Sequence, residues 1–296
     1  MIDKPTVGFI GQGFIGKHLA DYFESQLFSV VRYSLEEPYV NNRAAIGNCK
    51  IVFIAVPTPT TPDGFDLAAL ETVLPLIGRG NIAVIKSTVL PGSCAQLQAA
   101  FPEIIILHAP EFLREKTVLA DTIAPERNII GLTVEDDVHI QAAEKVLAIL
   151  PRAPYEKICR SVDSEIIKYG SNCFLAMKVV FMNVLFDAAA AAGADYSVIS
   201  EAMAADKRIG SSHMNVVDRS GHSASGLGRG AGGHCFPKDL AAWRQWYAAA
   251  CEADEYGQRF LLAIEQKNNS LLRASGKDVD LLELIYGDIT VASTES

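Results

Sequence analysis

The stretch "GRGAGGHCFPKD", residues 228–239, holds the most reactive combination of side chains in this sequence. Four glycines in six residues precede Cys235, and Lys238 and Asp239 follow it. A cysteine is nucleophilic as the thiolate, which a nearby cation or a helix N-terminus favours. Glycines let the backbone pass close to a ligand where a Cβ atom would clash. The stretch therefore predicts a nucleophilic Cys235, although Asp239 also suits the N-terminus of a helix that begins near Pro237.

Other candidate side chains follow predicted strands or share a helix face. Lys168 and Asn172 are four residues apart in a helix-like segment, so they lie on one face of it, although such a pair is also typical of a plain surface. Thr88, Glu111 and Glu115 come soon after two apolar strand-like runs. The carboxyl ends of strands are where ligands and catalytic groups gather in open α/β sheets. We therefore expect these residues to contribute to one site.

The run "GQGFIG" predicts a dinucleotide site. Gly11, Gly13 and Gly16 form a GxGxxG pattern between the apolar run 6–10 and a helix-like segment. The pattern gives a tight turn, close approach to a pyrophosphate and a phosphate at the helix N-terminus.

The second part of the dinucleotide fingerprint departs from the usual pattern. The acid expected on the ribose falls on Ser34, which leaves room for a 2′-phosphate near Arg32. Glu36 and Glu37 follow at once and would repel that phosphate, and either is able to reach the ribose. The sequence favours NAD over NADP.

The elements that must position these residues change in character along the chain. Short apolar runs alternate with helix-like stretches in the first half, which predicts an α/β fold with a Rossmann-type, doubly wound parallel sheet. The runs are 6–10, 29–33, 51–56, 82–87, 104–108 and 128–132, and the helix-like stretches are 14–26, 67–78, 92–100 and 134–150. From Ser161 the pattern is helical, beginning with one long central helix of roughly 45 Å.

This change predicts three parts of the chain. Residues 1–160 form a NAD-binding Rossmann-like domain, 161–275 an all-helical central and dimerisation domain, and 276–296 a C-terminal tail. Shorter helices are expected at 196–205, 238–252 and 255–273. The long helix is apolar around much of its surface, so we expect it to serve both a core and a homodimer interface.

Composition excludes several classes of protein. The 296 residues are 49% hydrophobic and 21% charged, with a net charge of −9, so nucleic acid and anionic membrane are not expected partners. The N-terminus has no signal-peptide pattern, and Lys178, Asn183 and Asp187 interrupt the most apolar helix. The six cysteines have neither disulfide-scaffold nor metal-ligand spacing. We expect a cytoplasmic protein without a metal site.

Several motifs together resemble the UDP-glucose/GDP-mannose dehydrogenase family, and in particular its UDP-sugar branch. They are "GQGFIG", "VPTPT", "KSTVLPG", "PEFLRE", "PERNIIG", "EIIKYGSNCFLA", "KRIGSSHM" and "GGHCFPKD", in the family's order. The matches extend from residue 5 to about 240, and "PEFLRE" and "GGHCFPKD" are far more specific than a GxGxxG.

The resemblance implies oxidation of a sugar C6 alcohol to a carboxylate with two NAD⁺. In this reading Cys235 is the nucleophile that forms a thiohemiacetal and then a thioester. Lys168 stabilises the oxyanion beside Asn172, and Asp239 and Thr88 hold water and assist proton transfer. Glu115 belongs to the hydrolysis and cofactor region.

The resemblance also assigns the binding residues. Those for the cofactor are Gly11, Gly13, Phe14, Ile15, Gly16, Ser34, Val56, Pro57, Thr58, Ser87, Thr88, Glu115 and Lys238. Those for a nucleotide-sugar-like substrate are Glu111, Phe112, Leu113, Lys168, Asn172, Arg208, Gly232, Gly233 and Cys235. Arg208 matches an arginine that often reaches the substrate across a dimer interface.

Four features depart from the family pattern. The sequence stops where the family begins a third, UDP-binding domain, so it resembles a short form. Ala231 replaces a phenylalanine, Val184 replaces a common glutamate, and the loop between the second and third predicted strands is shorter. The substrate is therefore less well determined than the chemistry. Two alternatives stay open: a two-electron hydroxyacid-type dehydrogenase that needs no cysteine, and a non-catalytic NAD-binding module.

Overall fold

The structure, a computed structural model, describes residues 4–114 and 117–287 of the chain. It divides into two compact units. Unit 1 consists of Met1–Thr58 and Asp66–Lys168, and unit 2 of Pro59–Phe65 and Tyr169–Ser296. The division falls within the long helix rather than at its start, and it assigns a short segment from the first half of the sequence to unit 2.

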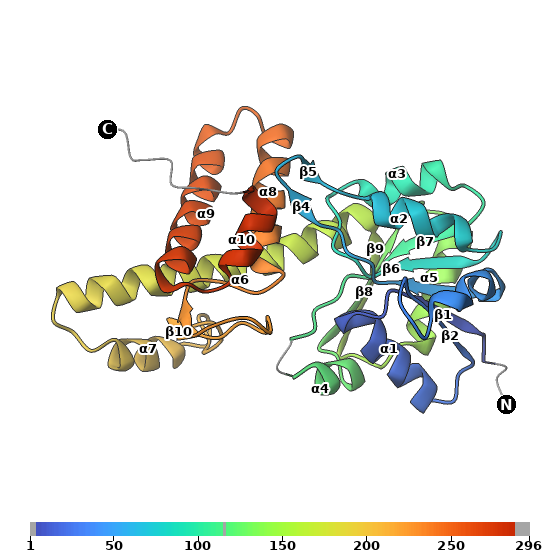
Figure 1. The fold of residues 1–296 in the computed structure, drawn as a ribbon, viewed down its shortest axis with the longest axis horizontal. Helices are drawn as coiled ribbons and strands as arrows, with labels where there is room; N and C mark the ends of the chain where they lie inside the picture. Colours follow the sequence, from blue (N-terminus) through green and yellow to red (C-terminus); the bar gives the residue numbers. More distant parts are fainter. Residues whose placement is uncertain (1–3, 115–116, 288–296) are drawn as a thin grey trace. The chain divides into compact units, whose positions relative to one another are not determined.

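Unit 1 is built on a seven-stranded sheet in the order β2-β1-β3-β6-β7-β8-β9 (Figure 1). The strands are β1 (Val7–Ile10), β2 (Val30–Tyr33), β3 (Ile51–Ile54), β6 (Ile82–Ile85), β7 (Ile105–His108), β8 (Arg127–Leu132) and β9 (Tyr155–Arg160). Every neighbouring pair is parallel except β7 and β8, which are antiparallel. The predicted doubly wound α/β fold is confirmed. Strand β9 was not predicted, because its residues are half-exposed or exposed and form no apolar run.

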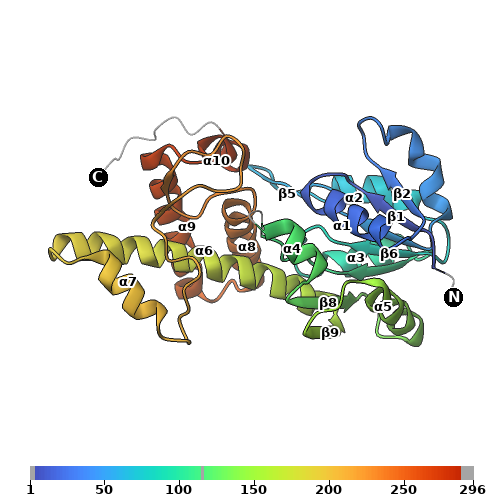
Figure 2. The same cartoon turned by 90° about the horizontal axis from the view of Figure 1, so that it is seen from below.

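Helices cover both faces of this sheet. Residues of α1 and α5 pack with β1, β3 and β6 in one core, and α2 and α3 lie on the other face (Figures 1 and 2). The helices are α1 (Phe14–Ser25), η1 (Val40–Asn48), α2 (Ala68–Val73), η2 (Leu74–Leu76), α3 (Ser93–Ala100), α4 (Val118–Ile123) and α5 (Asp137–Ile149). The first strand, first helix and third strand meet through the rings of Phe9, Phe23 and Phe53. This core holds the strand ends that carry the candidate residues.

Unit 2 is a helical body around the long helix α6 (Ser161–Ala191), whose first turns belong to unit 1. The other helices are α7 (Tyr196–Ala204), α8 (Phe236–Ala250), α9 (Glu255–Ser275) and α10 (Val279–Tyr286), and two short strands, β10 (Val217–Asp218) and β11 (Gly228–Arg229), pair antiparallel. Cys173, Ala176 and Val180 of α6 pack with Leu240 of α8 and Ile264 of α9. Helix α10 occupies part of the predicted C-terminal tail, residues 276–296.

A hairpin from the first half of the sequence belongs to unit 2. Strands β4 (Thr60–Thr61) and β5 (Gly64–Phe65) pair antiparallel and pack on α8 and α10. The Thr60 hydroxyl donates to the carbonyl of Lys238, at 3.4 Å. The hairpin thus fastens the start of α8 within unit 2.

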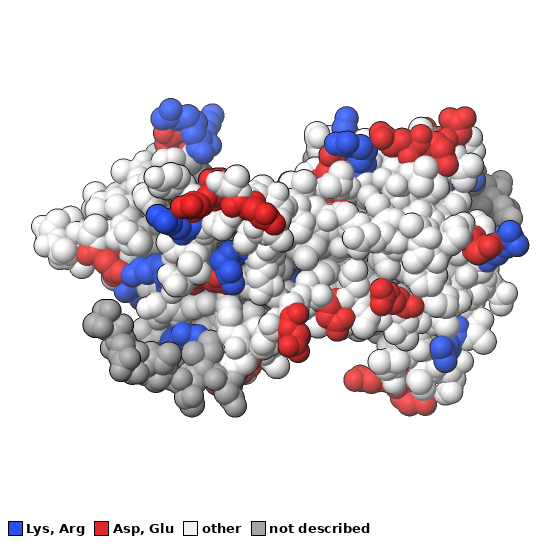
Figure 3. Space-filling view, turned by 90° about the horizontal axis from the view of Figure 1, so that it is seen from above, with Lys and Arg blue, Asp and Glu red and all other residues white. Residues whose placement is uncertain are grey.

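By length and composition alone, helix α6 is apolar enough to cross a membrane. In the structure, however, its side chains Tyr169, Ala176, Met182 and Asn183 are buried. The ring of Tyr169 stacks on Trp243 of α8, with centroids 5.8 Å apart. These contacts are those of a helix at the centre of a helical domain. On the face shown in Figure 3, acidic and basic side chains lie among one another on both units.

Candidate active site

The glycine turn after β1 is shaped for a dinucleotide. Gly11 has φ of +88°, and a Cβ there would lie 2.4 Å from the Ala55 carbonyl oxygen. A Cβ on Gly16 would lie 1.9 Å from the Gly11 oxygen. Gly13 is the N-cap of α1, makes no side-chain cap bond, and borders open space. The first N–H groups of α1 are therefore available to a phosphate at a helix N-terminus, and these residues fit the pyrophosphate of NAD.

At the end of β2, Arg32 forms ion pairs with carboxylates of its own unit. Its guanidinium bonds to Asp21 at 2.6 Å and to Glu24 at 2.8 Å. The Ser34 hydroxyl donates to the carbonyl of Glu36 at 2.9 Å. A guanidinium held by two acids is poorly placed to bind the 2′-phosphate of NADP, which agrees with the preference for NAD expected from the sequence.

Two predicted cofactor loops are bonded to each other at the ends of β3 and β6. The Thr58 hydroxyl donates to the carbonyl of Thr88 at 2.7 Å, and the Ser87 hydroxyl donates to that of Val56 at 2.6 Å. Pro57 between them is exposed. Neighbouring parallel strands bring these segments, thirty residues apart in sequence, to the same edge of the sheet.

Lys168 is buried against the loop that follows β7. Its Nζ atom donates to the Glu111 carbonyl at 2.5 Å and lies 5.5 Å from the centre of the Phe112 ring. The Glu111 carboxylate pairs with Lys86 at 3.0 Å. The structure thus brings Glu111, Phe112 and Lys168 together. Leu113 follows in the same loop, and Glu115 lies outside the described residues.

Sequence reasoning missed Lys86 and His108 in this place. Lys86 directly follows the buried strand β6, and His108 is the last residue of β7. The imidazole Nδ1 of His108 is 2.7 Å from the Ser164 hydroxyl. Burial lowers the pKa of His108 to about 3, and the charges of Lys86 and Lys168 act in the same direction. A neutral histidine therefore lies in the same charged neighbourhood as the candidate lysine. The sequence signal for Lys86 and His108 is their position at the carboxyl ends of apolar runs.

In unit 2, the buried Asp239 is the centre of a polar set whose other members are partly exposed. Its side chain is 1% exposed and accepts hydrogen bonds from Asn172 and Lys238, each at 2.6 Å. The alternative of a simple helix cap is wrong, because Cys235 is the N-cap of α8 and Asp239 lies inside the first turn. Lys168 and Asn172 lie one turn apart on α6, as their spacing predicts.

Cys235 is exposed at the N-terminus of α8. The helix begins at Phe236, and Pro237 stands in its first turn, where a missing N–H does no harm. The positive end of the helix dipole favours a negative group at this position. This placement suits a thiol that must act as a thiolate.

Three other residues of unit 2 that the sequence singled out, Arg208, Ala231 and Val184, differ in their exposure. Arg208 is 90% exposed and pairs with Asp206 at 2.6 Å, so in one protomer it points to its own loop. Ala231 is buried in the core with residues of α6 and α8. Val184 is 46% exposed on α6. The small side chain at 231 therefore fills the interior of unit 2. Among the described residues, no group of three or more His, Cys, Asp or Glu side chains is arranged to hold a metal ion.

Comparison with known families decides the relationship of this chain. The profile described as "UDP-glucose/GDP-mannose dehydrogenase family, NAD binding domain" matches residues 23–150, and the one for the family's central domain matches 162–270. The chain belongs to the UDP-glucose/GDP-mannose dehydrogenase family. Its cofactor is accordingly NAD, whose domain in this family is the one matched by unit 1.

Individual relatives agree with this assignment. The chain is 31% identical to UDP-glucose 6-dehydrogenase of Rickettsia conorii, over 93% of this chain and 62% of that protein. It is 30% identical to UDP-glucose 6-dehydrogenase YwqF of Bacillus subtilis, over 91% of this chain and 63% of that protein. The chain thus spans less than two thirds of the length of these curated relatives.

Solved structures show the same fold. A UDP-glucose dehydrogenase from Pyrobaculum islandicum is similar with a TM-score of 0.74 and 26% identity, over 89% of this chain and 68% of that one. A 3-hydroxyisobutyrate dehydrogenase from Mycobacterium tuberculosis shares the fold, with a TM-score of 0.67 and 16% identity, over 96% and 98% of the two chains.

Proposed function

We propose that this protein oxidises the C6 alcohol of a nucleotide sugar such as UDP-glucose to the uronic acid, in a four-electron reaction with NAD. The observation that carries the proposal is the bonding of Asn172 and Lys238 to the buried Asp239, one turn after the exposed Cys235 at the start of α8. A hydroxyacid oxidation of two electrons has no need of a thiol at a helix N-terminus.

The chemistry proceeds through two oxidations and one hydrolysis. The alcohol first becomes an aldehyde, and the Cys235 sulfur adds to its carbonyl carbon while the oxygen gains a proton, which gives a thiohemiacetal. Loss of a hydride and a proton gives the thioester. Water then replaces sulfur at the carbonyl carbon, which releases the acid and restores the thiol. When bound, NAD⁺ accepts the hydride of each oxidation, so two NAD⁺ are reduced per substrate.

The predicted catalytic side chains have distinct roles in this proposal. Lys168, with its ammonium on α6, and Asn172, one turn later, donate to the oxygen that develops negative charge. Asp239 holds the Asn172 amide in orientation and assists proton transfer with Thr88. The glycine turn of unit 1 holds the cofactor. NAD-dependent chemistry with a reduced thiol supports a location in the cytoplasm.

Counting NADH per substrate tests the proposal. We expect two NADH from each UDP-glucose consumed by the wild-type protein. The variant Cys235→Ser is expected to form at most one NADH, with an aldehyde that hydroxylamine or a hydrazine traps, because it cannot form the thioester. One NADH in the wild type together with full activity of Cys235→Ser would instead favour the two-electron dehydrogenase. Calorimetric NAD binding without turnover on a panel of sugar nucleotides would favour a non-catalytic module.

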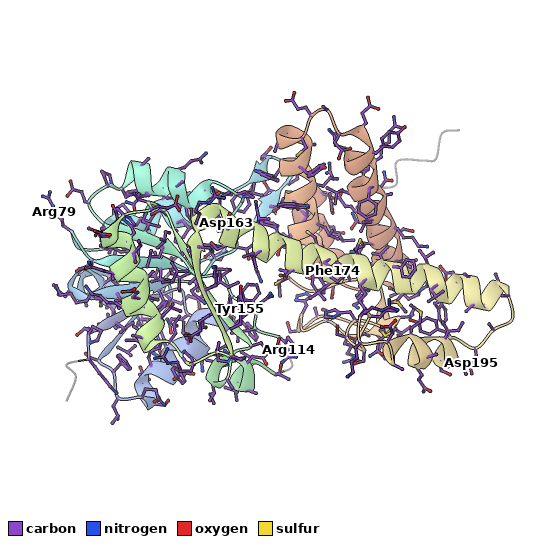
Figure 4. All side chains as sticks on the ribbon, turned by 180° about the vertical axis from the view of Figure 1, so that it is seen from behind. Arg79, Arg114, Tyr155, Asp163, Phe174 and Asp195 are labelled. Atoms are coloured by element: carbon purple, nitrogen blue, oxygen red, sulfur yellow. The ribbon has the colours of Figure 1, made fainter. Side chains whose placement is uncertain are left out.

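We further propose that the protein is a homodimer through its helical domain. Phe174, labelled in Figure 4, Phe181 and Val184 of α6 are 60%, 56% and 46% exposed and lie on one face by their spacing of seven and three. Val198 of α7 is also exposed, at 64%. A second copy of this apolar face is the partner that fits it. We expect Phe174→Glu with Phe181→Glu to give a monomer by light scattering, and a wild-type monomer would contradict the proposal.

A further inference from the structure

The backbone that precedes Cys235 is held by side chains from the end of α9 and the turn into α10. The Asn268 side chain bonds to both the N–H and the C=O of Ala231, at 2.7 and 3.0 Å. Lys277 donates to the Gly230 carbonyl at 3.0 Å, and the Asp278 carboxylate accepts from the Gly233 N–H at 2.7 Å. Side chains thus take the place that a neighbouring strand would have beside this segment.

The glycines in the segment permit this close approach. A Cβ on Gly232 would lie 2.1 Å from an Asp278 carboxylate oxygen, and one on Gly228 would lie 2.6 Å from Ser275 and Lys277 atoms. Gly230 and Gly233 have φ of +93° and +81°, which side chains disfavour. The glycines therefore have a structural reason that is separate from substrate access.

The side chains that hold the segment are themselves buried. Asn268 is 0% exposed, and Lys277 and Asp278 are each 3% exposed. A buried ion or amide costs free energy unless it is hydrogen-bonded, and each of these groups forms at least one hydrogen bond with the backbone at 230–233. One Asp278 oxygen accepts from Gly233, and the other has no hydrogen-bond partner among the described residues. The carboxylate is thus directed at the glycine segment.

We propose that Asn268, Lys277 and Asp278 are positioning residues that fix the Cys235 thiol. The bonded Gly233 stands two residues before Cys235, and the Asp239 N–H donates to the Cys235 carbonyl at 2.8 Å in the first turn of α8. The nucleophile is therefore held from both sides, by a clamped backbone and by a helix start. The catalytic part of this inference rests on the function proposed above.

A positioning role makes a specific prediction about the two oxidations. The first oxidation needs no thiol, whereas the second needs the sulfur placed against the aldehyde carbon. Loosening the segment should therefore lower the yield of the second NADH and release aldehyde, with little change in the KM for the alcohol. A loss of stability alone would lower both oxidations equally.

The test compares Asp278→Ala with Asp278→Asn. Asparagine keeps an acceptor for the Gly233 N–H, since only one carboxylate oxygen is used, so it should restore wild-type behaviour. In hydrogen–deuterium exchange of the full chain, Asp278→Ala should exchange the 228–235 amides about tenfold faster than the wild type, with the amides of α6 unchanged. Glu283→Gln, an exposed carboxylate on α10, is the matched control. If Asp278→Ala fails to fold, Lys277→Met tests the bond to Gly230 by the same measurement.

Exchange in 228–235 that equals the wild type in Asp278→Ala, or in Lys277→Met where that variant is used, would overturn the inference. Faster exchange with an unchanged NADH count would overturn the catalytic part. If the wild-type protein consumes no sugar nucleotide, the proposed function fails by itself. The positioning role is then tested by hydrogen–deuterium exchange together with the rate at which iodoacetamide alkylates Cys235. We expect this alkylation rate to change in Asp278→Ala and to stay unchanged in Asp278→Asn.

Discussion

The two glycine-rich segments of this protein are close-packed for different reasons. In unit 1, the Cβ atoms that Gly11 and Gly16 lack would clash with backbone oxygens of Ala55 and Gly11. In unit 2, the Cβ that Gly232 lacks would clash with the side chain of Asp278, which comes more than forty residues later. The first segment packs against backbone atoms. The second packs against side chains from the turn between α9 and α10.

This difference shows which glycine patterns can be interpreted from the sequence alone. A turn that closes on backbone atoms, which every residue type supplies, needs only the GxGxxG spacing, so the pattern can be recognised in any sequence. A segment clamped by remote side chains depends on residues that no local pattern includes. The two segments should therefore respond differently to the same glycine-to-alanine change.

The largest expected effect is in the unit 1 turn. Gly16→Ala forces a Cβ to 1.9 Å from a backbone oxygen, so the turn must distort, and we expect a stability loss of about 3 kcal/mol together with loss of NAD binding. Gly13→Ala meets no atom within 4 Å and should keep wild-type stability while weakening NAD binding. Chemical denaturation and calorimetry with NAD measure the two quantities. Equal stability losses in both variants would contradict this reading of the turn.

The next effect tests the side-chain clamp in unit 2. Gly232→Ala should lose about 2–3 kcal/mol of unfolding free energy, because its Cβ overlaps a buried carboxylate. In an Asp278→Ala background the same change should cost much less, because the overlapping atom is gone. A double-mutant cycle by urea denaturation gives the coupling. Additive losses would show that the clash is not with Asp278.

The smallest effect depends on pH and separates the two units. Burial lowers the pKa of His108 in unit 1 to about 3, whereas the unfolded chain has the ordinary value near 6.5. Below pH 6.5 the unfolded state therefore binds a proton that the folded state does not, so stability falls as the pH falls from 6.5 toward 3. At pH 5 we expect a loss of about 2 kcal/mol relative to pH 7.5.

Denaturation across this pH range, followed by hydrogen exchange in peptides of each unit, measures the effect. The variant His108→Gln cannot gain the proton and should flatten the profile of unit 1. A pH dependence that is unchanged in His108→Gln would assign the loss to other groups.

Much of the fold follows from local pattern. Six of the sheet's strands, helix α1 and the long helix α6 lie where apolar runs, glycine punctuation and helical spacing predict them. Strand β9 was not predictable in this way, since it is half-exposed and gains its place by pairing with β8. The antiparallel direction of β8 against β7 has the same origin, because apolar runs carry no direction.

The residues of the candidate site could be predicted from the sequence, but the hydrogen bonds and contacts between them could not. Cys235, Asp239, Asn172 and Lys168 are all visible in the sequence, and the family resemblance adds their roles. That Asp239 bonds Asn172 rather than capping α8 is decided by the packing of α8 on α6. Lys86 and His108 join Lys168 because neighbouring strands end at the same edge of the sheet.

The sequence by itself determined a dinucleotide-binding α/β domain, a helical second half and an unusual cysteine. Periodicity and glycine spacing encode these features within a few residues, and where a distant partner is needed, as Ala55 is for Gly11, its backbone atoms suffice whatever its side chain. Only the tertiary structure decided that the glycines before Cys235 form a clamped segment rather than a flexible approach. The clamping atoms come from Asn268, Lys277 and Asp278, and folding alone brings their helix corner to that backbone.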